Sequence, residues 1–440
     1  KNLGQQIIKS TRIALKEIGS EKIEIYLKDT NSDPNKALKS ATELKNMGIK
    51  IVIGPIFHDQ DLFINELEII GEDFNLRIKY KPVVDPETYI IKNLTAEDSI
   101  AIIPNPQGVT NLANRNLILS VNDLEVDNMK ISELYSSHLT NIVSYEENMY
   151  GGWLRLFPNS LIWFDISKSE KFPELDFTNY ELLMNSTKKI ADSGVSPWCA
   201  NSESAASTGW IQTNWLEDII LTKHGPEIYD RWSNLEISAS NVKIYSSVKE
   251  IGDYIFYPSH IHGSHPAIYY REFRNLPKIL LDDSNDCFLS WSGHYFKNYI
   301  PDNFTYGVDY GVIKLPHIKY QDVVTGIGDS LVLIKNDSNS KIVFQEILSK
   351  NFGREWSKSQ NSDFISPNRN FDKKLIKNDL TKYEFQIIHT ALQNDLFRYD
   401  ASEIMDRPIG SSLLWKMLLD YMKKGQESLV NLLNELDKEI

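Results

Sequence analysis

The sequence predicts an α/β protein that is built around a mostly parallel sheet and divided into two lobes or domains. Strand-like and helix-like segments alternate through the first hundred residues, which is the pattern of strands joined by helices. The chain has 440 residues, more than one ordinary hydrophobic core supports, and 41% of them are hydrophobic. We therefore expect a folded α/β protein with two cores.

The first half of the chain supplies the predicted elements in a regular order. Helices are assigned where apolar residues recur every three or four positions, and strands where they alternate or form short runs that end at Gly or Pro. In chain order the elements are a helix at 5–18, a strand at 22–28, a helix at 33–47, a strand at 49–53, a helix at 62–74 and strands at 76–80, 99–103 and 160–164.

The second half is punctuated by glycine and proline. Residues 323–334 read as two short strands broken by Gly326 and Gly328. The last 35 residues are predicted to be helical, with Pro408 at the entry and Gly425 between two helices. We find no internal repeat and no flexible linker in the sequence.

Composition excludes several classes of partner. The net charge is −13, so the chain has no basic face to neutralise phosphates, and a nucleic-acid ligand is not expected. No run of 18 apolar residues occurs, so no membrane-spanning segment is predicted. The chain begins at Lys1 without a methionine, and we expect that a leader, with or without a lipid anchor, was removed before this residue.

The chain has two cysteines, Cys199 and Cys287. Such a sparse pair is either two buried thiols or one disulfide. A bridge across this separation would stabilise the fold by about 4 to 5 kcal/mol on the chain-entropy model. A bridge would also place the protein in an oxidising compartment.

The segment Pro197–Trp215, PWCANSESAASTGWIQTNW, combines the groups that a sugar requires. Indole rings offer flat apolar faces, and small residues let the backbone approach a ligand closely. Glu203 and Ser204 offer directional hydrogen bonds to hydroxyl groups. The alternative is a core loop anchored by Trp198 and Trp210.

From about Ile49 to Ile440 the chain resembles the solute-binding proteins of carbohydrate ABC importers. It is most similar to the α-glucoside-binding branch and, more distantly, to the maltose-binding proteins. The motifs that carry the resemblance occur in order over nearly the whole chain: IVIGPIF, IAIIPNPQG, SLIWF, PWC…ESAASTGW…TNWLEDIIL…GPEIYDRW, DDSNDCF, VTGIGDSLVLI, FISPNRN and FRYDASEIM…GSSLLWKMLLDY.

The resemblance implies a type II periplasmic-binding-protein fold, in which two α/β lobes joined by crossing strands close on a sugar. It places 49–159 and 323–364 in lobe 1, and 160–322 and 365–440 in lobe 2. Its hinge crossings fall at 160–164, at 323–328 and near 364–368. The two cysteines occupy positions of the family, which favours a Cys199–Cys287 disulfide.

Residues 1–48 do not belong to that family. Together with the strand that follows, they resemble the start of a type I periplasmic binding domain. A type I domain needs several more strand–helix units to bury its sheet, so we expect a small α/β appendage that packs on lobe 1. Docking of a partner is the alternative role.

The resemblance and the strand ends predict ligand contacts on both lobes. The candidates are Phe57, His58, Asn105, Trp153, Arg155, Glu203, Ser204, Trp210, Trp291, Asp329 and Trp415. Trp210 is the first choice for a stacking ring, and Trp415 lies where distant relatives place another. Packing is the alternative for Trp153, and a salt bridge is the alternative for Glu203.

The chain departs from the family at several cleft positions. Ile56, Phe57 and His58 form a bulkier loop than usual, and Phe157 replaces a common asparagine. Ser290 and Trp291 stand where the family often has a His-Arg pair. These changes suggest a less charged and more aromatic cleft, so an exact sugar is not carried over.

The expected function is therefore that of a monomeric, periplasmic or extracellular sugar-binding protein that delivers its ligand to an ABC permease, without a cofactor. The alternatives are a signalling receptor of the same fold, a binder of another polar solute, and a glycosidase. Acid pairs such as Asp282-Asp283 favour a glycosidase only weakly, since adjacent acids are usually solvated. The histidines of HIHGSH, residues 260–265, lack a nearby carboxylate or cysteine to complete a metal site.

Overall fold

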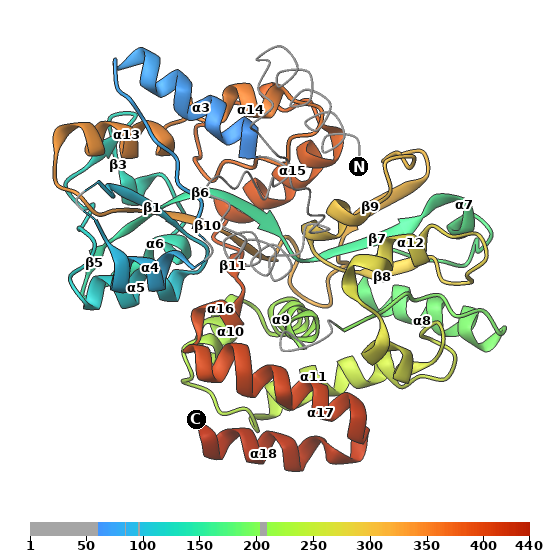
Figure 1. Ribbon diagram of the computed structural model, residues 1–440. Coiled ribbons are helices and arrows are strands. Elements are labelled where there is room, and N and C mark those ends of the chain that lie inside the picture. The colour runs from blue at the N-terminus through green and yellow to red at the C-terminus, as the bar shows by residue number, and fades with distance from the viewer. Residues whose placement is uncertain (1–59, 84, 96, 203–208) are drawn as a thin grey trace, which may run out of the picture. The chain divides into compact units, whose positions relative to one another are not determined.

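The computed structural model describes residues 60–83, 85–95, 97–202 and 209–440 (Figure 1). The predictions for the appendage at 1–48 and for Phe57, His58, Glu203 and Ser204 lie outside the described residues. Residues 62–440 form one compact unit, and everything below concerns that unit and the start of its first helix. Within the described residues, no helix has both the length and the apolar character needed to cross a membrane.

The first sheet is organised around one long strand, β10 (Val324–Leu333). One edge of β10 pairs with β6 (Gly151–Pro158) in antiparallel fashion. Its other neighbours are β1 (Ile100–Ile103), which is antiparallel, and β11 (Phe397–Tyr399), which is parallel. These strands are mostly apolar and mostly buried, because helices of both lobes pack against them.

Among the described residues, seven helices belong to the lobe of the first sheet. They are α3 (Gln60–Asp73), α4 (Pro86–Asn93), α5 (Pro106–Asn114), α6 (Ser137–Asn141), α13 (Ser338–Leu348), α14 (Arg354–Lys358) and α15 (Asp379–Gln393). The described part of this lobe also contains two short β-hairpins. One pairs β2 (Glu125–Val126) with β3 (Met129–Lys130), and the other pairs β4 (Ser144–Tyr145) with β5 (Asn148–Met149).

The second sheet is antiparallel, in the order β8 (Leu289–Trp291), β7 (Leu161–Asp165) and β9 (Tyr310–Lys314). The helices of this lobe are α7 (Ile166–Ser169), α8 (Tyr180–Asp192), α9 (Trp210–His224), α10 (Pro226–Ser233), α11 (Val242–Ile255), α12 (Leu276–Leu280), α17 (Trp415–Lys424) and α18 (Leu429–Glu439). Short 3₁₀ turns include η5 (His294–Tyr299). Residues 211–222 of α9 are all buried, which makes it the central helix of the lobe.

Three chain crossings connect the sheets, and Figure 1 shows the first of them where β6 runs on into β7. Residues 159–160 separate these two strands, and residues 315–323 separate β9 from β10. The third crossing follows β11, where α16 (Ala401–Ile404) and the π-helical turn η7 (Ile409–Leu414) lead to α17. The two-lobed α/β architecture that the resemblance implied is therefore present.

Four details of the sequence prediction are wrong. The strands are mostly antiparallel. In the first sheet β6 leaves at a crossing and β10 enters at one, and in the second sheet β7 enters and β9 leaves, so each of these pairs runs in opposite directions. Among the described pairs of named strands only β10–β11 is parallel. The third crossing is at Asp400 rather than near 364–368, since β11 pairs with β10 and keeps 397–399 with the first sheet. Residues 76–80 form no strand, and residues 324–333 form one strand instead of two.

Other predicted elements are confirmed. The helix at 62–74 and the strands at 99–103 and 160–164 occur as α3, β1 and β7 with shifts of one or two residues. The carboxyl-terminal helices are present, and Gly425 separates them with a φ of 85°, which a residue with a side chain rarely adopts. The disulfide Cys199–Cys287 is formed, with a Cα–Cα distance of 5.3 Å in the usual range for such bridges.

Candidate functional site

Arg155 and Asp329 lie opposite each other on β6 and β10, where the strand register shifts after Asp329. The Arg155 Nε is 2.6 Å from the Asp329 Oδ2, and each side chain keeps part of its surface exposed, 26% and 21%. The Phe157 ring lies 4.9 Å from the guanidinium carbon and the Trp356 ring lies 5.5 Å from it. The guanidinium thus contacts two aromatic rings and is paired with the Asp329 carboxylate.

Further charged residues connect this ion pair to the second lobe. Asp363 lies 3.9 Å from the Arg155 Nη1, and its Oδ2 is 3.7 Å from the Lys297 Nζ. His294, which is buried and stacked on Phe157, contacts Asp363 and hydrogen-bonds the Glu384 Oε2 at 2.8 Å. Lys297 and His294 belong to η5 of the second lobe, so the charges form one network across the hinge.

An aromatic group lies at the start of α9. Trp210 is the first residue of that helix, is half-buried, and meets Tyr295 edge-on at 4.9 Å and Phe273 at 5.3 Å. Gly209 before it has a φ of 116°, and a Cβ there would lie 2.7 Å from both the Cβ and the carbonyl oxygen of Trp415. The chain entering α9 at Gly209 therefore lies against the Cβ and the backbone of Trp415.

Trp415 is half-buried at the start of α17. Its indole Nε1 is buried and has no hydrogen-bond partner in the part of the chain that the structure describes. A buried N–H without an acceptor costs free energy, so this donor is an uncompensated polar group among the described residues.

Three other predicted contacts are engaged within the protein. Trp153 is 1% exposed, and its Nε1 donates to the Leu139 carbonyl at 2.9 Å. Trp291 is 2% exposed, and its Nε1 donates to the Asp218 Oδ2 at 2.8 Å. Asn105 caps α5, because its Oδ1 accepts from the Gly108 N–H at 2.7 Å. These positions indicate packing and capping roles, and we do not carry the three residues into the site.

Of the histidines at residues 260–265, His260 likewise serves the fold. The His260 ring is buried, with Nδ1 2.8 Å from the Tyr254 carbonyl oxygen and Nε2 2.9 Å from the Thr187 hydroxyl. Burial lowers the pKa of His260 to about 4. Among the described residues, no group of three or more His, Cys, Asp or Glu is placed to hold a metal ion.

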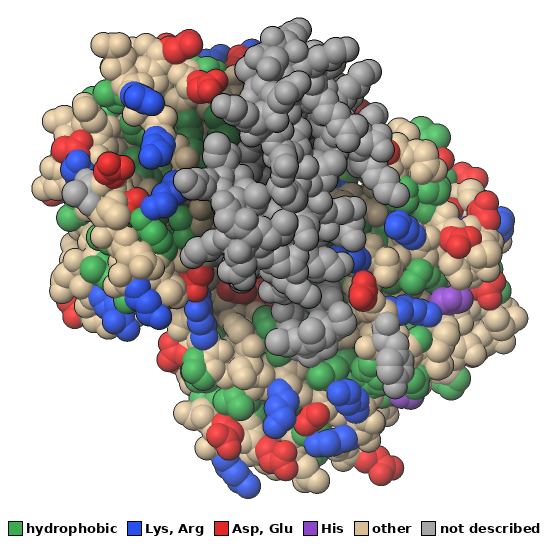
Figure 2. Space-filling view, in the orientation of Figure 1, with side chains coloured by type: hydrophobic (Ala, Val, Ile, Leu, Met, Phe, Trp, Pro, Cys, Tyr) green, Lys and Arg blue, Asp and Glu red, His purple; other side chains and the backbone are tan. Residues whose placement is uncertain are grey.

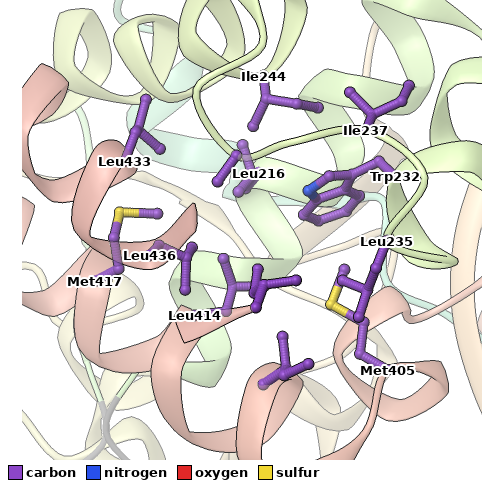
Figure 3. Close-up of a pocket in the computed structure, with 13 residues that line it drawn as sticks. Leu216, Trp232, Leu235, Ile237, Ile244, Met405, Leu414, Met417, Leu433 and Leu436 are labelled. Atoms are coloured by element: carbon purple, nitrogen blue, oxygen red, sulfur yellow. The ribbon is translucent and has the colours of Figure 1, made fainter. Parts of the chain in front are cut away.

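A separate apolar cavity lies between α9, α10 and the carboxyl-terminal helices (Figure 3). Its lining residues are Leu216, Trp232, Leu235, Ile237, Ala239, Ile244, Met405, Ile409, Leu414, Met417, Leu433, Leu436 and Ile440. The lining is almost entirely hydrocarbon and thioether, so it cannot satisfy the hydroxyl groups of a polar solute. We therefore do not assign this cavity to ligand.

The surface carries both signs of charge. Figure 2 shows Lys and Arg side chains interspersed with Asp and Glu on the visible described surface, without a large patch of one sign.

Sequence reasoning missed several members of the site. Lys297, His294 and Asp363 carry no motif that sets them apart from other charged residues. Asp363 reaches Arg155 directly, and Lys297 and His294 of η5 join the network through Asp363. Tyr295, which contacts Trp210, was missed for the same reason. The cluster depends on tertiary contacts that spacing along the chain does not reveal.

Comparisons with known proteins place these features in context. No protein-family model matches the chain. The alpha-glucosides-binding periplasmic protein AglE of Rhizobium meliloti (strain 1021) is 25% identical over 378 residues, 83% of this chain and 81% of that protein. The osmoprotective compounds-binding protein GgtB of Synechocystis sp. is 24% identical over 329 residues, 73% of this chain and 76% of that protein.

Solved structures agree on the fold. The bacterial solute receptor AcbH, described as having an exclusive preference for β-D-galactopyranose, aligns with a TM-score of 0.71 and 12% identity. The alignment covers 87% of this chain and 95% of that one. Together these comparisons confirm the resemblance to solute-binding proteins of sugar importers, and they confirm the two-lobed α/β fold.

Proposed function

We propose that this chain, a relative of the solute-binding proteins of sugar ABC importers, captures a sugar between its two lobes and delivers it to an ABC permease. One observation carries the proposal: the similarity to AglE extends over 83% of the chain. By that similarity we propose an α-glucoside or a related oligosaccharide as the ligand class.

The site has the chemistry that such a ligand requires. Asp329 and Arg155 on the first lobe offer a carboxylate acceptor and guanidinium donors, both partly exposed. Trp210 and Trp415 on the second lobe offer rings for the apolar face of a sugar. A ligand that contacts both lobes at once would favour the closed arrangement. Phe57, His58, Glu203 and Ser204 remain predictions outside the described residues.

We also propose that the protein works outside the cytoplasm, as a monomer. AglE is a periplasmic protein. The disulfide Cys199–Cys287 persists most readily in an oxidising compartment. Anchoring by a lipid and docking on permease subunits belong to the same proposal.

Thermal-shift screening tests the ligand class. A ligand that binds only the folded state raises the unfolding free energy by about 4 kcal/mol at a thousand times its Kd. We expect trehalose, sucrose or maltose to raise the melting temperature at millimolar concentration. Amino acids and organic acids should give no shift. If an amino acid or an organic acid stabilises the protein and no sugar does, the sugar proposal is wrong.

Replacing Trp210 with alanine should weaken binding of the sugar found in that screen by about tenfold or more, since a stacking face worth roughly 1.4 kcal/mol is lost. Isothermal titration calorimetry measures the change. Tyr299→Ala is the matched control, because Tyr299 also packs edge-on against Phe273, at 5.7 Å, and is 36% exposed. Equal affinity in the Trp210 variant and the control would contradict the stacking role.

A further inference from the structure

Two of the sequence motifs meet at the boundary between the lobes, outside the candidate site. The motif GPEIYDRW supplies Tyr229 and Asp230 on α10 of the second lobe. The motif FRYDASEIM supplies Arg398 and Tyr399 on β11, which pairs with the first sheet. Figure 1 shows α10 close below β11, where the chain is about to enter the third crossing. Sugar capture uses neither pair of residues, so their role follows from their contacts.

Arg398 is fixed by the backbone of its own lobe and directs its remaining N–H groups at Asp230. Its Nη1 donates to the carbonyl oxygens of Asp395 and Phe397, both at 2.8 Å. Its Nε lies 2.6 Å from the Asp230 Oδ1, and its Nη2 lies 3.0 Å from the Oδ2. The Arg398 side chain is 6% exposed and that of Asp230 is 35% exposed. Such a bidentate pair fixes the orientation of the two groups as well as their distance.

Two neutral side chains complete the contact. The Tyr229 hydroxyl donates to the Tyr399 carbonyl at 2.8 Å. His138 of α6 accepts from the Tyr399 N–H through Nε2 at 3.0 Å, so its Nδ1 carries the proton and faces the Asp230 Oδ1 at 3.5 Å. Burial lowers the pKa of His138 well below its ordinary value, and the ring is therefore neutral. We call these five residues the lobe brace: His138, Tyr229, Asp230, Arg398 and Tyr399.

The lobe brace differs from the contacts at the crossings themselves. Asp218 of α9 accepts hydrogen bonds from the hydroxyl groups of Ser160, in the first crossing, and Thr325, just after the second. A hinge rotation moves atoms least at the crossings, so these bonds can persist while the lobes turn. Helices α6 and α10 contribute no residue to a crossing. A change in the angle between the lobes therefore displaces α10 from α6 and strains the lobe brace.

Other charged contacts between the lobes have weaker geometry. His294 and Lys297 of η5 reach carboxylates of the first lobe through single nitrogen–oxygen contacts, at 2.8 to 3.7 Å. Arg407, in the third crossing, pairs with Glu87 of α4 at 3.0 Å, but its side chain is 55% exposed. Exposed ion pairs contribute little to stability. Among pairs of described residues, Arg398–Asp230 is the one bidentate ion pair that joins the two lobes.

We propose that the lobe brace sets the angle between the two lobes when no ligand is bound. With the brace intact, the lobes occupy a narrow range of angles. Without it, α10 can shift relative to α6, and the range widens. The proposal concerns the two-lobed fold and does not rest on the identity of the ligand. Failure of the sugar screen would leave it intact, and its own failure would leave the sugar proposal intact.

A distance measurement between the lobes tests the brace without any ligand. Spin labels are attached to Ser338→Cys on α13 and Asn185→Cys on α8, two exposed positions on opposite lobes, while the native disulfide stays closed. Double electron–electron resonance then gives the distribution of interlobe distances. Asp230→Asn keeps the size of the side chain and removes its charge. We expect the distribution to become about one and a half times as wide, or wider. An unchanged width would overturn the proposal.

Two controls separate the brace from a general loosening of the protein. Glu250→Gln breaks the ion pair of Lys223 with Glu250, 3.0 Å long and confined to the second lobe, and should leave the interlobe width unchanged. A second label pair, Asn185→Cys with Val430→Cys, lies at exposed positions of the second lobe alone. Its distribution should keep its width in Asp230→Asn. If the distances within the lobe widen as much as those between the lobes, the brace proposal is wrong.

Two further variants keep the test decisive if Asp230→Asn folds poorly, since it leaves a buried cation unpaired. The double variant Asp230→Asn with Arg398→Gln removes both charges. Tyr229→Phe keeps the ring and removes only the hydroxyl that reaches Tyr399. Circular dichroism checks that each variant is folded. Each folded variant should widen the interlobe distribution, Tyr229→Phe least. A folded double variant with the width of the unmodified protein would contradict the proposal.

Discussion

Replacing Trp291 with alanine should lower the free energy of unfolding by about 4 kcal/mol, as is typical for removal of a buried aromatic side chain. The Trp291 ring is 2% exposed and packs against Trp215, Tyr254 and Tyr180. Its removal leaves a cavity beside β8. It also removes the N–H that donates to the buried Asp218 carboxylate, which adds a desolvation cost.

Urea unfolding followed by circular dichroism measures this loss. Trp291→Phe keeps most of the volume and removes the N–H, so it should lose less than the alanine variant and isolate the hydrogen bond. The sequence predicted Trp291 as a ligand contact, and the structure favours packing. A variant that keeps its stability within about 1 kcal/mol but no longer binds the sugar would reverse this conclusion.

The fold class could be predicted because periodicity and family motifs are spread along the whole chain. The strand 99–103 and the carboxyl-terminal helices were found from local patterns, since apolar runs and glycine stops act within a few residues. The third crossing was misplaced for a different reason. Strand β11 has three residues, Phe397–Tyr399, and only its pairing with β10 shows to which sheet it belongs.

Strand direction was the other failure. Alternating strands and helices in the first hundred residues favoured a parallel sheet. Strand β6 runs into the first crossing and β10 returns from the second, so the two pair in antiparallel register. The same antiparallel register brings together two candidate site residues that the sequence analysis predicted separately. Arg155 and Asp329 were each predicted as ligand contacts, while their 2.6 Å ion pair depends on the alignment of two strands 174 residues apart.

The sequence alone does not show whether a tryptophan side chain lies on the buried or the exposed face of its helix or strand. Trp153 and Trp210 were both candidates, and tertiary packing separates them. Trp153 lies in a strand that is covered on both sides and contacts Tyr399 at 5.2 Å. Trp210 begins a helix, where a ring can remain half-exposed. The acids of α9 were missed altogether, because buried carboxyl groups look like surface charges until their partners are known.

Removing the disulfide should lower the free energy of unfolding by about 4 kcal/mol in the double variant Cys199→Ala with Cys287→Ala. The bridge closes a separation of 88 residues, and its main effect on the chain-entropy model is to restrict the unfolded state. Urea unfolding with linear extrapolation measures the loss. Both residues are replaced together, so that no free thiol remains to be oxidised.

The folded geometry around the bridge should survive its removal, because the backbone holds the same segments together. The Cys199 N–H donates to the Leu289 carbonyl at 2.7 Å, and the N–H groups of Phe288 and Leu289 both donate to the Pro197 carbonyl at 3.0 Å. The double variant should therefore bind the sugar with unchanged affinity at temperatures where it is folded. A large loss of sugar affinity in the folded double variant would show that the disulfide shapes the binding site. If the free energy of unfolding falls by less than about 1 kcal/mol, the unfolded chain gains little conformational freedom when the disulfide is removed.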